Sequence, residues 1–117
     1  MEKTMNETVQ NICKALSEKS ATNIKIIDVK GVNDLANYFV VCTGRSAPQV
    51  KAIDDFLEET MEKQGKFAMH KDGARDGRWI VLDYGEVIVH IFHKDLRDVY
   101  ALDSLWNHGN NVTDYND

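Results

Sequence analysis

Apolar and polar residues alternate along the chain with periods typical of both helices and strands. Apolar residues recur at helical spacing over residues 4–19, which predicts an amphipathic helix. NIKIIDVKG, residues 23–31, alternates and ends in glycine, which predicts a strand. VNDLANYF predicts a short helix, and YFVVCTG, residues 38–44, is a continuous apolar run typical of a strand that is buried on both faces.

The clearest boundary along the chain is the start of a second long helix. Ser46 is suited to cap it, Pro48 falls in its first turn, and Gln49 stands three residues after the cap. Gly65 provides a stop signal at its end. The apolar stripe of this predicted helix consists of Val50, Ile53, Leu57 and Met61.

The segment after Gly65 predicts three strands and a final helix. KFAMH is expected to be a short strand and KDGARDGR a loop. GRWIVLDYGEVIVHIFH predicts two strands joined at Tyr84-Gly85. An apolar stripe from Leu96 to Trp106 predicts a helix that ends at Gly109, and residues 110–117 are expected to form a disordered tail.

The order of these elements predicts the fold class. Strands alternate with helices early and then follow one another, which is typical of an α/β (α+β) domain with a mixed sheet of about five strands flanked by helices. This order is similar to the nucleotidyltransferase topology, although the metal site of those enzymes is not expected. We predict a single domain over residues 1–109.

The hairpin of residues 77–93 has two different faces. A tight turn is expected to place Asp83 opposite Glu86, and facing like charges cost a fraction of a kcal/mol. One face is expected to belong to the core; it holds Arg78, Ile80, Leu82, Val87, Val89 and Ile91. The other mixes large apolar groups with an imidazole; it holds Trp79, Val81, Ile88, His90 and Phe92.

The mixed face allows two interpretations. In the first, a helix covers it and the two acids only keep its rim in contact with water. In the second, part of it is exposed and binds another protein, because aromatic anchors surrounded by charge are common at interfaces. An arriving lysine or arginine would then relieve the repulsion between Asp83 and Glu86.

Composition and charge limit the classes of partner. The 117 residues are 43% hydrophobic and 28% charged and carry a net charge of −5. This charge opposes tight binding to nucleic acid and favours a basic protein surface. No apolar run reaches the roughly 18 residues of a membrane span, and the acidic N-terminal segment does not resemble a secretory signal. We therefore expect a cytoplasmic protein in which Cys13 and Cys42 are buried, reduced thiols.

Several candidate sites also have simpler explanations. Gly44-Arg45-Ser46 stands at a strand-to-helix junction, where amide groups bind phosphate in some enzymes, but a strand end with a helix cap explains it equally. Asp83 and Glu86 are three residues apart across a turn, which does not suit a shared metal. His90 and His93 are expected to point to opposite faces of one strand. The sequence therefore predicts no catalytic residue, metal or cofactor.

The cations Lys71, Arg75 and Arg78 are concentrated in one predicted loop. A solvated turn explains this loop.

The sequence resembles the ribosomal silencing factor family, also called Iojap-like, from NIKIIDVKG to Trp106. The similarity rests on NYFVVCTGRSAPQVKAI, GRWIVLDYGEVIVHIFH and RDVYALDSLW together. Glu86 stands where many relatives have aspartate, which preserves the charge.

The resemblance implies a non-enzymatic protein that is a homodimer when free. It implies binding to the large ribosomal subunit through ribosomal protein L-fourteen, steric block of small-subunit joining and repression of translation. It also gives the basic loop a functional alternative, a peripheral contact of Lys71, Arg75 and Arg78 with ribosomal RNA. A metal-dependent nucleotidyltransferase-like enzyme is the alternative. By motif, the implied contact residues are Trp79, Val81, Asp83, Tyr84, Glu86, Arg97 and Tyr100.

Overall fold

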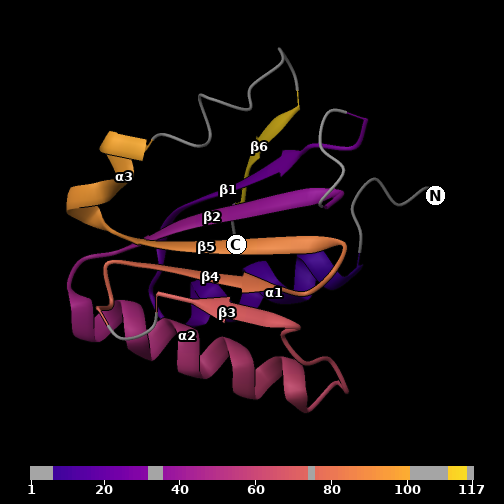
Figure 1. Ribbon diagram of the computed structural model, residues 1–117, viewed down its shortest axis with the longest axis horizontal. Helices are drawn as coiled ribbons and strands as arrows, with labels where there is room; N and C mark the ends of the chain where they lie inside the picture. Colours follow the sequence, from indigo (N-terminus) through magenta and orange to yellow (C-terminus); the bar gives the residue numbers. More distant parts are fainter. Residues whose placement is uncertain (1–6, 32–35, 74–75, 101–110, 116–117) are drawn as a thin grey trace.

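The computed structural model describes residues 7–31, 36–73, 76–100 and 111–115. These residues form one mixed sheet of six strands in the order β3-β4-β5-β2-β1-β6 (Figure 1). The strands β2 and β5 pair in parallel, and the other neighbours are antiparallel. The strands are β1 (Thr22–Asp28), β2 (Tyr38–Gly44), β3 (His70–Asp72), β4 (Trp79–Asp83), β5 (Val87–His93) and β6 (Val112–Asp114).

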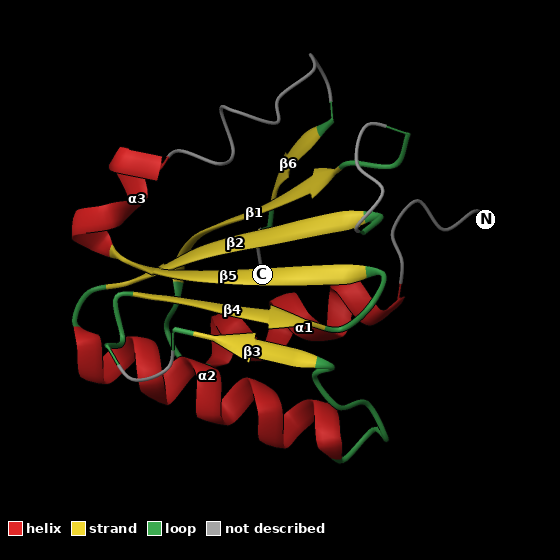
Figure 2. Ribbon diagram, viewed as in Figure 1, coloured by secondary structure: helices red, strands yellow, loops and turns green. Residues whose placement is uncertain are grey.

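Helices cover the two faces of the sheet unequally. The long helices α1 (Glu7–Glu18) and α2 (Ala47–Glu62) pack on one face, which we call the inner face (Figure 2). The short helix α3 (Lys94–Tyr100) contributes Leu96 to the opposite side, the outer face. The central strand β2 is therefore covered on both sides and is almost wholly buried, as its apolar run predicted. The predicted fold class is confirmed.

The start of α2 is determined by local chemistry. Ser46 Oγ accepts the amide hydrogen of Gln49 at 3.2 Å, and Gln49 Oε1 accepts that of Arg45 at 2.9 Å. These two bonds satisfy donors that a helix start otherwise leaves open. The prediction of this cap is confirmed.

Three predicted elements differ from the structure. The strand expected at residues 66–70 lies instead at His70–Asp72, so part of the expected loop is strand β3. Residues 38 and 39 of the expected short helix belong to β2, while residues 32–35 lie outside the described part. The tail is not disordered throughout, because β6 pairs with β1 along Lys25–Ile27.

The final helix is confirmed only for its first part, since residues 101–110, including Trp106 and Gly109, lie outside the described residues. Cys13 and Cys42 are buried and unpaired, as predicted. Burial raises the pKa of Cys13 to about 12. None of the described helices has the length and apolar content that a bilayer span requires.

Candidate functional site

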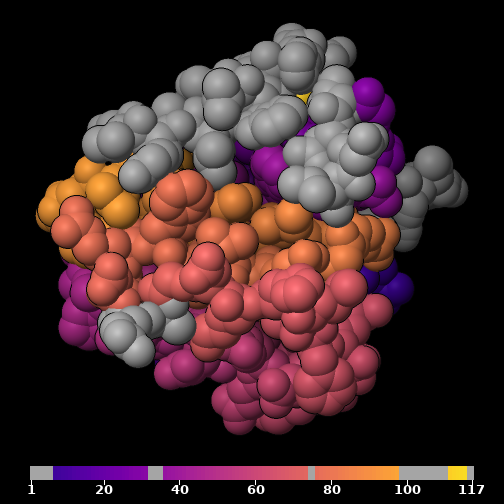
Figure 3. All heavy atoms as spheres, viewed as in Figure 1, coloured from indigo at the N-terminus to yellow at the C-terminus, as the bar shows by residue number. Residues whose placement is uncertain are grey.

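The outer face gathers the side chains of the predicted mixed face. On β4 these are Trp79, Val81 and Asp83, which alternate with the inner residues Ile80 and Leu82. The register places Val81 opposite His90 and Trp79 opposite Phe92, so these side chains share one side of the sheet. Figure 3, drawn from this side, shows the β3–β4 end of the sheet at the molecular surface.

The hairpin register differs from the predicted one by two residues. Asp83 lies opposite Ile88 rather than Glu86, so the expected facing pair of acids does not form. Asp83 Oδ1 instead accepts the amide hydrogen of Gly85 at 2.8 Å, and Tyr84 donates its amide hydrogen to the Val87 carbonyl at 2.9 Å, so the tip of the turn lies at Gly85-Glu86 rather than at Tyr84-Gly85. Because the shift is an even number of residues, the side chains of β4 and β5 stay on their predicted faces. Arg78, which was expected on the core face, precedes β4 and is exposed.

Trp79 is held in place by two aromatic neighbours. Its indole stacks on Phe92 with ring centroids 4.8 Å apart, and its Nε1 donates to His90 Nδ1 at 3.2 Å. This bond makes Nε2 the protonated nitrogen of neutral His90, and Nε2 is buried with no hydrogen-bond partner among the described residues. Burial lowers the pKa of His90 to about 4, so the ring is neutral near pH 7.

The outer face is covered on the β5 side and open on the β4 side. Ile88, His90 and Phe92 are buried in an apolar cluster that Leu96 of α3 contacts. Trp79 and Val81 are only half-buried. The covering that the first interpretation expected is found on β5, and the exposure that the second expected is found on β4. Binding of another protein to the exposed part stays a prediction.

Tyr84 lies on the other side of the sheet from Trp79. It packs against the inner core, and its hydroxyl is buried without a hydrogen-bond partner in the described part of the chain. Burial and the nearby carboxylate of Glu58 raise the pKa of its phenol. Strand alternation after Ile80 and Leu82 could have predicted this inward orientation.

The remaining predicted contact residues have different environments. Glu86 is exposed at the turn, where its backbone carbonyl accepts amide hydrogens from Asn37 and Tyr38. Arg97 is only 5% exposed and joins α3 to the sheet by donating to Thr43 Oγ1 at 2.6 Å. The Tyr100 side chain lies outside the described residues.

The cations of the predicted basic loop do not act as one group. Lys71 Nζ lies 2.8 Å from Asp54 Oδ2 and 2.6 Å from Glu58 Oε2, so its charge is neutralised against α2. Arg78 is exposed, and Arg75 lies outside the described residues.

Sequence reasoning missed the acidic partners of Lys71. Burial raises the pKa of Asp54, which is 2% exposed, to about 7. Asp54 stands four residues after Val50, on the buried stripe of α2. An acid at a position of the apolar stripe could have indicated that it has a cationic partner. Oxygen atoms of Asp54, Asp55 and Glu58 lie within 4.8 Å of one another. The Lys71 ammonium group lies beside two of these acids, Asp54 and Glu58, where a metal ion would have to bind.

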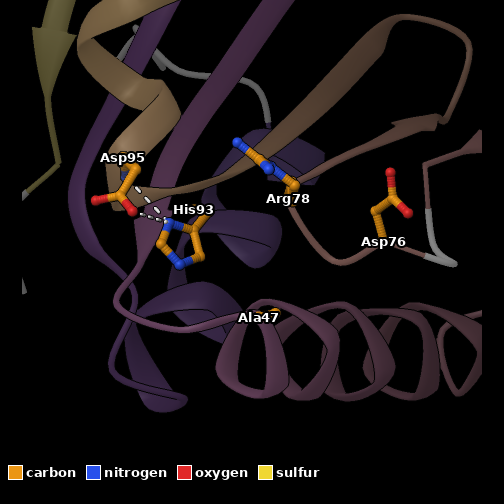
Figure 4. Close-up of a pocket in the computed structure, with 5 residues that line it drawn as sticks. All are labelled: Ala47, Asp76, Arg78, His93 and Asp95. Atoms are coloured by element: carbon orange, nitrogen blue, oxygen red, sulfur yellow. Dashed lines mark hydrogen bonds and ion pairs between the residues drawn. The ribbon is translucent and has the colours of Figure 1, made fainter.

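A polar pocket of about 310 Å³ lies at the carboxyl ends of the parallel strands β2 and β5. Figure 4 shows Arg78, His93 and Asp95 together near the start of α2. His93 Nδ1 accepts the amide hydrogen of Asp95 at 3.0 Å. Charges of both signs line the pocket, so it defines no class of ligand; the described lining residues are Ala47, Asp76, Arg78, His93 and Asp95.

The junction between β2 and α2 does not resemble a phosphate-binding loop in its contacts. The amides of Arg45 and Gln49 are already bonded within the cap. A Cβ atom at Gly44 would lie 2.8 Å from Val50 Cγ2, so this glycine allows the strand end to approach α2 closely. The structure therefore favours the strand-end interpretation of Gly44-Arg45-Ser46.

Known proteins are similar to this chain over most of its length. A family model described as ribosomal silencing factor during starvation matches residues 2–117. The ribosomal silencing factor of Halalkalibacterium halodurans is 36% identical over 100 residues, with 86% of each chain covered. That of Bacillus subtilis is 37% identical over 92 residues, covering 79% of this chain and 78% of the relative.

Solved structures agree with these sequence comparisons. A crystal structure of a protein from Chromobacterium violaceum has a TM-score of 0.83 at 28% identity and covers 87% of each chain. A second, from Bacillus halodurans, has a TM-score of 0.78 at 35% identity and covers 86% of this chain and 93% of that one. The resemblance of the motifs is confirmed, and this chain belongs to the ribosomal silencing factor family.

Proposed function

We propose that this protein binds the large ribosomal subunit through ribosomal protein L-fourteen and prevents the small subunit from joining. The observation that carries the proposal is the family match over residues 2–117. Translation in the cytoplasm would fall because bound large subunits cannot enter initiation. Steric exclusion requires occupancy and no bond chemistry, so the protein would act without enzymatic activity.

The open half of the outer face is the proposed contact surface. Trp79 and Val81 supply half-buried apolar area on strand β4, and Asp83 and Glu86 supply negative charge beside it. An aromatic anchor with a polar rim is the arrangement that protein interfaces use. A net charge of −5 favours a basic protein as the partner over phosphate-rich RNA.

Other predicted residues take supporting parts in this proposal. Tyr84 packs beneath the turn, and Arg97 anchors α3, so both would position the surface rather than contact the partner. Tyr100 is retained as a proposed contact. Arg78 remains the candidate for a peripheral contact with ribosomal RNA, because Lys71 is neutralised by two acids. We also propose that the free protein is a homodimer.

Sedimentation with separated ribosomal subunits tests the proposal. We expect the wild-type chain to sediment with large subunits but not with small subunits, and to reduce the formation of joined ribosomes. Asp83→Asn is the informative variant, because the amide oxygen can still accept the Gly85 hydrogen while the negative charge is removed.

A loss of about threefold to fivefold in affinity is expected for Asp83→Asn, the range of one exposed charge pair. Glu18→Gln, which removes the same charge from an exposed position on α1, serves as the matched control. Absence of wild-type binding to large subunits would refute the function. Equal binding by Asp83→Asn and wild type would remove Asp83 from the contact.

A further inference from the structure

A small pocket opens on the outer face, near the β3 edge of the sheet. Its volume is about 230 Å³, and its described lining residues are Asp72, Gly73, Trp79 and Val81. Asp72 lies directly opposite Val81 in the β3–β4 pair, and Trp79 is two residues from Val81 on the same strand. The three side chains therefore share one face of the sheet.

The size and lining of the pocket limit what it can hold. Pockets for drug-sized molecules measure roughly 300–1,000 Å³, so this smaller pocket suits a single long side chain. Its walls are the Trp79 indole, the Val81 side chain and the Gly73 backbone, and its only charged lining group among the described residues is the Asp72 carboxylate.

The apolar wall is rigid before any partner arrives. The Trp79 indole is fixed by its stack on Phe92 and its hydrogen bond to His90. The Gly73 backbone lies so close to Trp79 that a Cβ atom on Gly73 would be 1.9 Å from the Trp79 carbonyl oxygen. A wall that is already ordered adds little entropic cost to binding.

Asp72 carries a charge that no cation of the described residues balances. The residue is exposed, and its Oδ1 accepts the amide hydrogen of Gly73 at 3.0 Å. The adjacent Lys71 points instead to α2, where it pairs with Asp54 and Glu58. The bond from Gly73 holds the carboxylate beside the pocket.

From this geometry we propose that the pocket binds the side chain of one lysine or arginine of the protein partner. The methylene groups would pack on Trp79 and Val81, and the cationic head would pair with Asp72. This inference rests on the proposed function, since it assigns one residue of that partner to one place on the outer face. A phosphate group is disfavoured because the carboxylate would repel it.

A peptide titration followed by nuclear magnetic resonance tests the pocket without ribosomes. The probes are acetyl-Gly-Lys-Gly-amide, its arginine counterpart and a norleucine counterpart that lacks the charge. We expect the cationic peptides to shift the resonances of the Trp79 indole and the Gly73 amide. The Asp72→Asn variant keeps the acceptor for Gly73 and should bind them about threefold to fivefold more weakly.

Two results of the titration would overturn the proposal. The first is equal binding of the lysine and norleucine peptides to the wild-type chain. The second is a short oligouridine that shifts the same resonances more strongly than the cationic peptides, because the pocket would then prefer phosphate or base.

Sedimentation with large subunits supplies the second readout. Asp72→Asn should weaken binding by a similar factor, and Glu18→Gln should leave it unchanged. If wild type binds and Asp72→Asn binds equally well, the pocket proposal fails while the proposed function stands. If wild type does not bind subunits, the proposed function fails, and the peptide titration still decides whether the pocket takes a cationic side chain.

Discussion

Gly73 shows how one residue determines the shape of the outer face. Its backbone has φ +84°, and its Cα approaches the backbone of Trp79 so closely that no side chain fits. Gly31 has the same φ, but a Cβ atom there would meet no described atom within 4 Å, so a side chain would experience only the conformational penalty. A substitution at Gly31 therefore measures backbone strain alone, and one at Gly73 measures strain together with steric overlap.

We expect Gly73→Ala to lower the free energy of unfolding by about 2–4 kcal/mol, as backbone strain and overpacking add. Gly31→Ala should cost about 1 kcal/mol from strain alone. Urea denaturation followed by tryptophan fluorescence measures both losses. Equal losses would contradict the steric account of Gly73.

His90 should link stability to pH. Its pKa falls from an ordinary 6.5 to about 4 in the folded protein because the ring is buried. The unfolded chain therefore binds a proton more readily than the folded one. The contribution of His90 is complete above pH 6.5 and is lost as the pH falls through 4, up to about 3 kcal/mol.

Unfolding free energies at about pH 7 and about pH 5, for wild type and His90→Gln, test this linkage. Glutamine can still accept the hydrogen of the Trp79 indole, while it does not titrate. We expect stability to fall less on acidification in His90→Gln than in wild type. An identical fall in both proteins would assign the pH dependence to other groups.

At the scale of elements, Lys71 joins strand β3 to helix α2. The strand is short and lies at the sheet edge, so the ion pairs of Lys71 with Asp54 and Glu58 add an attachment to α2 beside the pairing of β3 with β4. Asp54 is 2% exposed, and removal of the cation would leave its carboxyl group buried without a cationic partner among the described residues.

Lys71→Met should lower the free energy of unfolding by about 1–3 kcal/mol, less than for a fully buried pair because the lysine is partly exposed. The double variant Asp54→Leu/Lys71→Met should recover most of this loss, since it replaces the charges with apolar contacts. Chemical denaturation of the three proteins measures the coupling. A double variant as unstable as Lys71→Met would show that Asp54 is not the source of the loss.

For the whole molecule, the net charge of −5 has a measurable consequence. A protein that docks by neutralising many phosphates releases counterions and loses affinity steeply with salt. Docking of an acidic face on a basic protein involves fewer charge pairs, so its affinity depends less steeply on the salt concentration.

We expect the affinity for large subunits to fall by less than about tenfold between roughly 50 and 200 mM salt, against about 10³–10⁵ for a protein with many phosphate contacts. Sedimentation at several salt concentrations measures this slope. Arg78→Ala should leave the slope nearly unchanged. A steep slope that Arg78→Ala reduces would indicate that RNA dominates the contact.

The sequence by itself determined the elements whose signals are local. The cap formed by Ser46 and Gln49, the apolar run of β2 and the alternation of the hairpin each depend on neighbouring residues, and each was predicted. The side of the sheet on which Trp79 and Val81 lie also followed, because strand alternation has a fixed period.

Tertiary structure alone decided the features that depend on distant residues. The position of the turn places Asp83 opposite Ile88, β6 pairs with β1 from the other end of the chain, and Lys71 pairs with acids of α2. The burial of Arg97 and the pocket beside Asp72 arose in the same way. Such contacts depend on which surfaces the packed sheet and helices bring together, and local periodicity carries no information about that choice.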